Sequence, residues 1–119
     1  MREVKYQAWE KKERVMFQVA RFDFADYSVY RHLFGEGIPA EQCDLREFTG
    51  MYDKNGKEIY EGDVLYDDLF EEYGLVVFEE GGFRVNWETI TDDLFENCDV
   101  LEIAGNLYED PELLEGAEE

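Results

Sequence analysis

Apolar residues near the start of the chain recur at every second position, which is the period of a β-strand rather than of a helix. Val15, Phe17 and Val19 follow this pattern, and they are β-branched or aromatic types that favour strands. The charged segment Glu10–Glu13 lies just before them and suits a surface turn. The first twenty residues therefore predict strand, turn and strand, and the aromatic-rich segment Tyr27–Phe34 predicts another strand.

Two glycines and a proline interrupt the pattern within residues 35–39. Because these residue types break regular elements, we expect a loop from Gly35 to about Gln42. From Asp44 the pattern becomes sharper, because Leu45–Thr49 leads directly into the turn residues 53–57, which predicts a strand followed by a turn.

The turn at residues 53–57 is the clearest local signal in the sequence. A two-residue loop of Asn55 and Gly56 would place Asp53 opposite Glu58, and directly opposed like charges destabilise a hairpin. A type I turn that begins at Asp53 places it opposite Lys57 instead, with Gly56 in the left-handed conformation and a bulge after it. We therefore predict the second register.

Further turns and strands follow after this hairpin. Glu61–Asp63 forms a second turn signal, and Val64–Tyr66 then begins a strand that fades into residues 67–72. A later hairpin is expected from Leu75–Phe78 and Phe83–Trp87. A loop of Gly81 and Gly82 would place Phe78 opposite Val85 and Val76 opposite Trp87, which makes one face apolar.

The last third of the chain predicts two short helices and one strand. Thr91–Phe95 is typical of a capped helix start, Val100–Ala104 of a strand, and Asp110 followed by Pro111 of a single helical turn. Short strands joined by Gly, Asn and Asp turns predict a mainly β fold, a small SH3-like or related β-barrel with short helical turns. We expect one domain over residues 1–119, with N-terminal strands in 1–34, central barrel strands in 44–108 and an acidic tail in 109–119.

Composition is compatible with a single core and with an intracellular protein. Hydrophobic residues make up 45% of the chain, and the longest apolar run, Leu75–Phe78, is far shorter than the ~20 residues of a membrane span. Cys43 and Cys98 lack the CxxC spacing of a metal or redox site, which favours two free thiols in a reducing cytoplasm over a single bridge.

Charge is distributed very unevenly along the chain. The net charge is -20, from 11 basic and 31 acidic residues. Residues 1–57 hold ten of each kind, whereas residues 58–119 hold one basic and 21 acidic residues. Such an excess repels nucleic-acid phosphates and anionic membrane surfaces, so we expect neither as a direct partner.

The central segment resembles the signature of the phage YopX protein family. The residues that carry the resemblance are Thr49, Gly50, Asp53, Asn55, Gly56, Ile59, Tyr60, Gly62 and Asp63. The opening segment Tyr6–Trp9 is also similar, with Gln7 in place of the usual Arg, and so is the closing segment Ile103–Leu114. The resemblance implies a small, mainly β protein encoded by bacteriophages and prophages, located in the cytoplasm of a bacterial host. It carries no established activity or site residues.

The sequence offers little for catalysis, for a metal or for a cofactor. A nucleophile needs an adjacent base, and besides the two cysteines the candidates are His32 and Ser28 alone. A calcium loop with Gly56 at its sixth position would place Met51 at the first, where Asp is required. We therefore predict no catalytic, metal or cofactor site, and an enzyme with an unusual site is the weakest hypothesis.

Two binding hypotheses remain. In the first, the protein is an adaptor that binds a phage or host protein through an acidic surface made of Asp67, Asp68, Glu71, Glu72, Glu79 and Glu80. In the second, it mimics DNA, since 20 charges at one per ~1.7 Å of duplex span ~34 Å, close to the ~35 Å expected for a domain of this size. The bland alternative is a surface that only confers solubility. For the aromatic side chains there are two alternatives, packing in the core or forming a cage that binds a cation. The exposed edges of the strands also allow a homo-oligomer.

Overall fold

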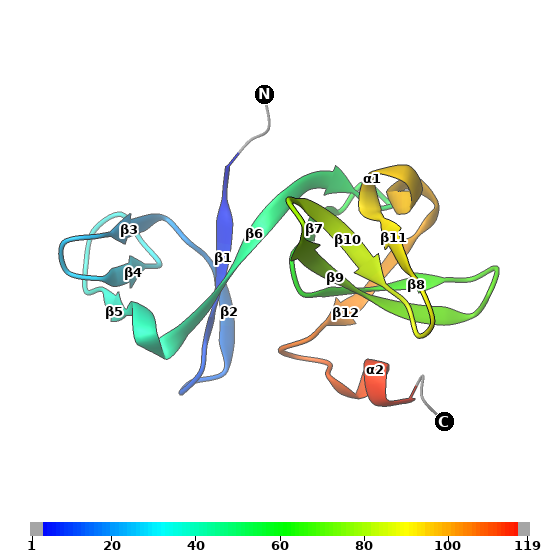
Figure 1. Cartoon of the computed structure of the whole chain (residues 1–119). Helices are drawn as coiled ribbons and strands as arrows, with labels where there is room; N and C mark the ends of the chain where they lie inside the picture. Colours follow the sequence, from blue (N-terminus) through cyan, green and yellow to red (C-terminus); the bar gives the residue numbers. More distant parts are fainter. Residues whose placement is uncertain (1–3, 117–119) are drawn as a thin grey trace. The chain divides into compact units, whose positions relative to one another are not determined.

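The computed structural model describes residues 4–116 and divides into two compact units (Figure 1). The first unit extends to Glu47 and the second begins at Phe48. Strand β6 (Cys43–Tyr52) passes from one unit into the other. The expectation of one domain with its three segments stays a prediction, and residues 117–119 of the predicted acidic tail lie outside the described residues.

The first unit is built from two small antiparallel arrangements. Strand β1 (Tyr6–Glu10) pairs with β2 (Val15–Gln18) across the predicted turn, and on its other edge with the beginning of β6. Strands β3 (Arg21–Asp23), β4 (Ser28–Tyr30) and β5 (Ile38–Pro39) form a separate three-stranded sheet. The buried hydrophobic cluster of the first unit is small and consists of Ala8, Phe17, Val29, Ala40 and Cys43.

Two sequence predictions in this unit need correction. The strand expected over Tyr27–Phe34 is only Ser28–Tyr30, because bends occupy the residues that follow. The loop expected over Gly35–Gln42 contains the two-residue strand β5 and the 3-10 turn η1 (Ala40–Gln42). Pro39 is tolerated there because β5 is an edge strand. Proline has no backbone N–H, and on an edge strand this absence need not cost a hydrogen bond of the sheet.

The second unit is a curled half-barrel sheet with few short helices, so the predicted mainly β, barrel-related fold is confirmed. Its five-stranded sheet has the order β11 (Thr91–Asp93), β10 (Gly82–Asn86), β9 (Glu72–Glu79), β8 (Asp63–Asp67) and β12 (Glu102–Asn106). Strand β7 (Glu58–Tyr60) pairs with the end of β6. The short helices are α1 (Leu94–Asn97), η2 (Cys98–Val100) and α2 (Glu112–Gly116).

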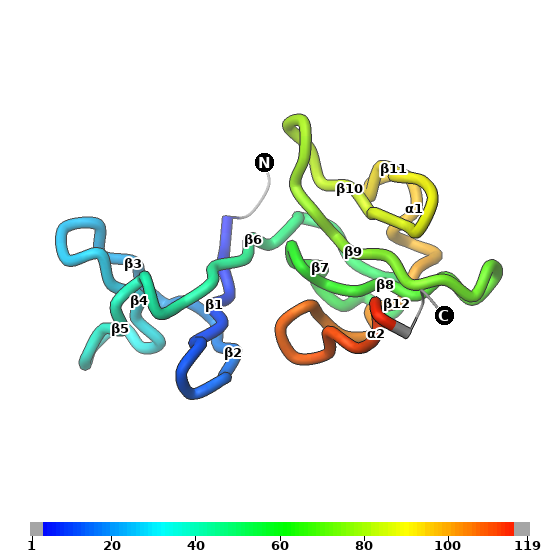
Figure 2. The backbone as a smooth tube through the Cα atoms, turned by 60° about the horizontal axis from the view of Figure 1, so that its bottom comes forward, coloured from blue at the N-terminus to red at the C-terminus, as the bar shows by residue number. Residues whose placement is uncertain are grey.

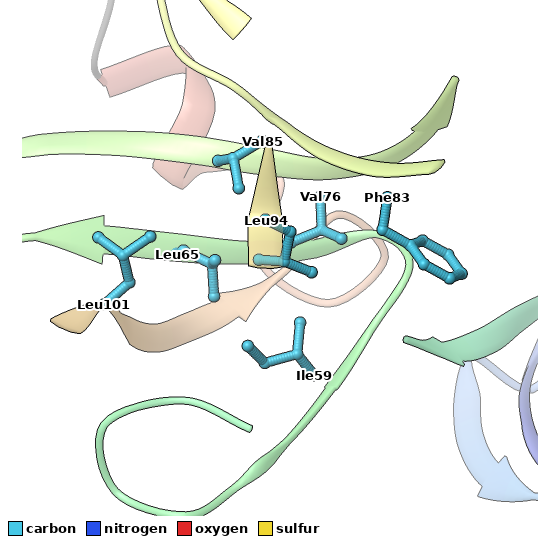
Figure 3. Packing of buried hydrophobic residues seen from close by; sticks show 7 residues of the cluster. All are labelled: Ile59, Leu65, Val76, Phe83, Val85, Leu94 and Leu101. Atoms are coloured by element: carbon cyan, nitrogen blue, oxygen red, sulfur yellow. The ribbon is translucent and has the colours of Figure 1, made fainter. Parts of the chain in front are cut away.

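The core of the second unit lies inside the curl of this sheet (Figure 3). Figure 3 shows side chains from β7, β8, β9, β10 and α1, with Leu101 after η2, gathered at the same face of the sheet. The cluster consists of Ile59, Leu65, Val76, Phe83, Val85, Leu94 and Leu101, and each of these side chains is buried. Strand alternation explains the pattern, because every second residue of β9 and β10 faces inward.

The turn after β6 has the predicted geometry. The amide of Gly56 donates to the Asp53 carbonyl at 3.0 Å, and the amide of Asp53 donates to the Lys57 carbonyl at 2.9 Å. Gly56 has a φ of 79°, the left-handed conformation that favours glycine. The prediction that Asp53 lies opposite Lys57 is therefore confirmed.

The register predicted for the β9–β10 hairpin is wrong by two residues. Val76 pairs with Val85 and Phe78 with Phe83, so the two-residue loop is Glu80–Gly81 rather than Gly81–Gly82. Both loop residues have positive φ, 51° for Glu80 and 80° for Gly81, which makes a type I′ turn that matches strand twist. A shift of two preserves the faces, and Val76, Phe83 and Val85 are buried on the same side.

The predicted elements near the end of the chain are present with shifted bounds. Asp93 caps α1 by accepting the Phe95 amide, so the helix begins after it, and Thr91–Asp93 is strand β11. The last strand is Glu102–Asn106 rather than Val100–Ala104. The Asp110 carboxylate accepts the Asn106 amide at 3.2 Å, whereas its carbonyl accepts the Leu113 amide at the start of α2.

Candidate functional site

Asp53 joins the central hairpin to the strand that ends the sheet. Its Oδ1 accepts the amides of Asn55 and Lys57, each at 2.9 Å, and its Oδ2 accepts the amide of Ile103 at 3.0 Å. Burial acts to raise the pKa of this carboxyl, but the three backbone donors outweigh it and hold the pKa below its ordinary value. Asp53 therefore acts as a structural anion.

Thr49 and Gly50 lie in a bulge that interrupts the pairing of β6 with β7. Phe48 pairs with Tyr60 and Tyr52 with Glu58, so the intervening residues of β6 oppose Ile59 alone. The Thr49 hydroxyl donates to the Ile59 carbonyl at 2.7 Å and accepts the Met51 amide at 3.1 Å. Gly50 has a φ of 85°, which turns the chain at this point.

Gly62 and Asp63 close the next turn. The Asp63 carboxylate accepts the Tyr60 amide at 2.8 Å, and the Gly62 amide donates to the Val76 carbonyl at the same distance. The Gly62 φ is 89°, and a Cβ at this position would lie 3.0 Å from the Tyr108 ring. The motif residues of the central segment therefore build turns, a bulge and the core, and none of them forms a reactive group.

The structure divides the six predicted partner-binding carboxylates into two groups. The first acidic group, at the β8–β9 hairpin, consists of Asp67, Asp68, Glu71 and Glu72, and the second acidic group, at the β9–β10 hairpin, consists of Glu79 and Glu80. The two hairpin tips lie at different ends of β9 in both views (Figures 1 and 2). The seven steps from Glu72 to Glu79 correspond to ~23 Å at the usual rise of a strand.

The first acidic group creates a negative potential around its hairpin. Burial first, and then the carboxylates of Glu71, Asp68 and Asp67, raise the pKa of the Tyr66 hydroxyl. Asp67 accepts the amides of Leu69 and Phe70, which fixes the turn, and Lys54 approaches Asp68 at 3.6 Å. One exposed cation cannot neutralise four carboxylates, so this hairpin stays strongly anionic.

A cavity of about 150 Å³ lies beside the first acidic group, and we call it the Trp87 pocket. Its apolar lining comes from Phe70, Trp87, Ile90, Val100 and Leu101, and its polar lining from Asp67, Glu72, Asp92 and Asn97. Three apolar lining side chains are unusually exposed, with accessible fractions of 69% for Phe70, 58% for Ile90 and 62% for Val100. The pocket thus combines an apolar wall with three carboxylates and no basic residue.

Trp87 is held in place at this pocket by a side chain of the next strand. Its indole Nε1–H donates to the Asp92 carboxylate at 3.0 Å. The sequence pointed to Asp67 and Glu72 but missed Trp87, Ile90, Asp92 and Val100. The one local signal was the pair of large apolar residues at 69 and 70, which stand inside an acidic turn where solubility alone would favour polar side chains.

The predicted candidates for nucleophilic chemistry lack an activating environment. Burial raises the pKa of the Cys43 thiol, helped by Glu10 and Asp44, and burial with Asp99 raises that of Cys98. A raised pKa lowers the thiolate fraction near neutral pH, which opposes reactivity. Both cysteines are free thiols.

The other candidates lie in the first unit. His32 is exposed in the bends after β4, and the Ser28 hydroxyl donates to the Asp26 carbonyl at 3.4 Å. Within residues 4–116, no three His, Cys, Asp or Glu side chains form a group that could hold a metal ion. In the same range, no helix has the length and apolarity needed to cross a bilayer.

Comparison with known proteins identifies the family of this chain and solved structures with a similar fold. The sequence pattern of the family described as YopX protein matches residues 5–115 of this chain. The crystal structure of protein EF1440 from Enterococcus faecalis is similar, with a TM-score of 0.76 and 24% sequence identity, over 96% of this chain and 99% of that one. No curated protein matches the chain.

Proposed function

Since this chain belongs to the YopX protein family, we propose that it is a non-enzymatic accessory protein, encoded by a phage or prophage, that binds a basic partner protein through the acidic surface of its second unit. The partner is a phage or host protein in the cytoplasm of the infected bacterium. The proposal concerns binding alone, because burial raises the pKa of both cysteine thiols and because motif carboxylates such as Asp53 and Asp63 form structural hydrogen bonds.

The observation that carries this proposal is the segregation of charge between the units. Residues 48–119 hold three basic and 22 acidic residues. Two of the three cations have acidic neighbours, since Lys54 lies 3.6 Å from Asp68 and Arg84 lies 3.8 Å from Glu80. The remaining negative charge attracts a basic surface, speeds its encounter and disfavours acidic competitors.

Six of these carboxylates stand at positions that a partner can reach. The exposed members at the hairpin tips are Asp68, Glu71, Glu79 and Glu80, while Asp67 and Glu72 are half-buried beside the Trp87 pocket. Large apolar side chains accompany both groups, such as Leu69 at 78% exposure and Phe78 at 49%. Apolar area next to steering charge is typical of protein-binding surfaces.

A capture experiment with charge-neutral variants tests the proposal. The tagged full chain is used to capture proteins from host cells carrying the phage, beside a variant with Asp67→Asn, Asp68→Asn, Glu71→Gln and Glu72→Gln and a second with Glu79→Gln and Glu80→Gln. We expect the wild type to retain a basic protein that moderate salt releases, because salt screens exposed charges. At least one of the two variants should lose the captured partner. Asp67→Asn keeps a side-chain oxygen that can accept the amides of the turn, so the hairpin should be preserved.

Two results would count against an adaptor. Equal retention by both variants would show that the acidic groups do not contact the partner. Recovery of this chain alone would favour self-association through its open strand edges, among them β11 and β12.

DNA mimicry is the second candidate, and the excess of 22 acidic over three basic residues in residues 48–119 supports it. The two acidic groups stand ~23 Å apart along β9, a span over which duplex DNA carries ~13 charges at one per ~1.7 Å, so a mimic would need carboxylates besides these six. A mimic predicts that the captured partner binds DNA and that duplex DNA competes with this chain for it. An adaptor predicts that DNA and this chain bind the partner independently.

A further inference from the structure

We propose that the Trp87 pocket accepts the guanidinium group of an arginine side chain presented by the partner protein. This inference rests on the proposed function and deepens it, because it identifies the point on the acidic surface where a specific contact is made. The pocket lies entirely within the second unit, between the β8–β9 hairpin, the residues that follow β10, and η2.

The size of the pocket selects one small group. Its volume of about 150 Å³ is below the ~300–1,000 Å³ of sites for drug-sized ligands. An apolar cavity of this volume holds a single benzene-sized molecule. A planar guanidinium is of that order, whereas a nucleotide or a large cofactor is not.

The charge of the lining selects a cation. Three of the nine lining residues are acidic and none is basic, so the lining carries a formal charge of -3. Each carboxylate has about four acceptor positions. Asp67 uses one oxygen for the amides of Leu69 and Phe70, and Asp92 uses one for the Trp87 indole, which leaves acceptor capacity on both.

The aromatic lining favours arginine over lysine. A guanidinium stacks on aromatic faces while its N–H groups bind carboxylates in a fork, and it is less strongly hydrated than an ammonium. The Trp87 pocket offers both features side by side, with Trp87 and Phe70 as aromatic surfaces and Glu72 and Asp92 as acceptors. The aliphatic stem of the same side chain would cover the exposed faces of Ile90 and Val100.

The fixed position of Trp87 makes the pocket directly observable. The chain has two tryptophans, Trp87 in the pocket and Trp9 in the first unit, so two indole N–H signals report separately on the two units. Titration of the ¹⁵N-labelled full chain with N-acetyl-arginine amide should shift the Trp87 indole signal with saturation in the millimolar range, about 1–10 mM. The Trp9 signal serves as the internal reference.

Two comparisons separate this contact from general attraction. N-acetyl-citrulline amide has the same shape without the charge, and we expect it to bind at least about tenfold more weakly, since it lacks the charge-assisted bonds. The variant Glu72→Gln with Asp92→Asn should weaken arginine binding by about tenfold or more. The matched variant Glu79→Gln with Glu80→Gln removes the same charge at the other end of β9 and should change it less than about twofold.

Three outcomes would overturn the proposal. The first is no saturable movement of the Trp87 signal at about 50 mM arginine amide, well above the expected dissociation constant. The second is equal binding of the citrulline probe, which would mean that shape alone fills the pocket. The third is equal weakening by both variants, which would mean that only net charge matters.

Failure here is distinguishable from failure of the proposed function. If the captured partner is retained by the Glu72→Gln, Asp92→Asn variant while the acidic-group variants lose it, the acidic surface binds the partner without this pocket. If the arginine probe binds but no partner is captured by the wild type, the pocket stands and the adaptor does not.

Discussion

The two units of this chain use charge differently. In the first unit, arginines lie over aromatic rings, with Arg21 3.7 Å from the centroid of Tyr30 and Arg14 5.6 Å from that of Trp9. Aspartates accept backbone amides in both units, as Asp23 does in the first and Asp53 in the second. Stacked cations therefore contribute to the structure of the first unit, and backbone-bound aspartates contribute more to that of the second.

This comparison explains part of the acidity of the second unit. The aspartates that hold turns and helix starts there are Asp53, Asp63, Asp67, Asp93 and Asp110. Short carboxylates suit this role because they reach the amides two or three residues away. The glutamates at the hairpin tips, Glu71, Glu79 and Glu80, are exposed instead, so a partner can reach them without disturbing a turn.

The strongest way to break the comparison is to remove a core side chain from each unit. Leu65→Ala should destabilise the second unit by about 2–5 kcal/mol, because it leaves a cavity in a fully buried cluster. Val29→Ala removes fewer methyl groups from the smaller cluster and should cost about 1–2 kcal/mol. Amide hydrogen exchange, read strand by strand, measures both effects.

The pattern of exchange decides whether the units are separate in energy as well as in packing. If Leu65→Ala exposes β8, β9 and β10 while β1 and β2 keep their protection, each unit opens on its own. Equal loss of protection in both would show one cooperative fold and would remove the basis of the comparison.

Asp53→Asn tests the use of a backbone-bound anion in the second unit. The change replaces one carboxylate oxygen, which accepts a backbone amide, by an NH₂ group that also donates. The free energy of unfolding should therefore fall by about 2–3 kcal/mol. Urea unfolding measures it. Asp68→Asn is a control that removes an exposed charge 3.6 Å from Lys54, and it should cost less than about 1 kcal/mol.

The same carboxylate predicts a direction of pH dependence. The folded pKa of Asp53 lies below its ordinary value, so its contribution is complete above the unfolded pKa of about 3.9. The contribution is lost as the pH falls below about 4 through the lower folded pKa. Wild-type stability should therefore fall more steeply than that of Asp53→Asn in this range, and parallel curves would contradict the assignment.

Gly62→Ala and Gly56→Ala sharpen the account of the turns. The two glycines have similar φ values, 89° and 79°, but only at Gly62 does the added Cβ meet a neighbour, the Tyr108 ring at 3.0 Å. We expect about 1 kcal/mol for Gly56→Ala from backbone strain and about 2–3 kcal/mol for Gly62→Ala from strain and crowding together. Thermal unfolding gives the difference, and equal losses would mean that Tyr108 moves aside freely.

The smallest expected effect concerns the first unit. Arg21→Leu removes the cation over Tyr30 and should cost about 0.5–1 kcal/mol, since Arg21 is partly exposed. Arg21→Lys keeps a cation without the planar group and should recover only part of the loss. An unchanged or increased stability of Arg21→Leu would show that the cation over the Tyr30 ring does not stabilise the first unit.

Sequence reasoning succeeded where one local constraint decided the structure. The Asp53 turn followed from Gly56 and from the charges at 57 and 58, all within five residues. The predicted register of the β9–β10 hairpin was wrong because Glu80 is a loop residue with a φ of 51°. Glutamate rarely adopts a positive φ, so its residue type gives no sign of this conformation. The adjacent glycine pair Gly81–Gly82 suggested a loop of equal length that begins one residue later.

The Trp87 pocket could not be predicted, because its lining comes from three segments that only the sheet brings together. Phe70, Trp87 and Val100 belong to separate turns, and nothing in the local sequence specifies their proximity. The two acidic groups illustrate the same limit from the other side. The sequence predicts one acidic surface for their residues, whereas strand β9 places them at different hairpins.

The role of aspartates in the turns has an evolutionary consequence. The carboxylates that hold the backbone, such as those of Asp53 and Asp63, are tied to the fold, whereas the exposed glutamates at the hairpin tips are not. Point mutations at these glutamates can therefore change the surface charge of this scaffold without altering its architecture. A lineage of this protein can revise that charge one glutamate at a time while the turns keep their aspartates.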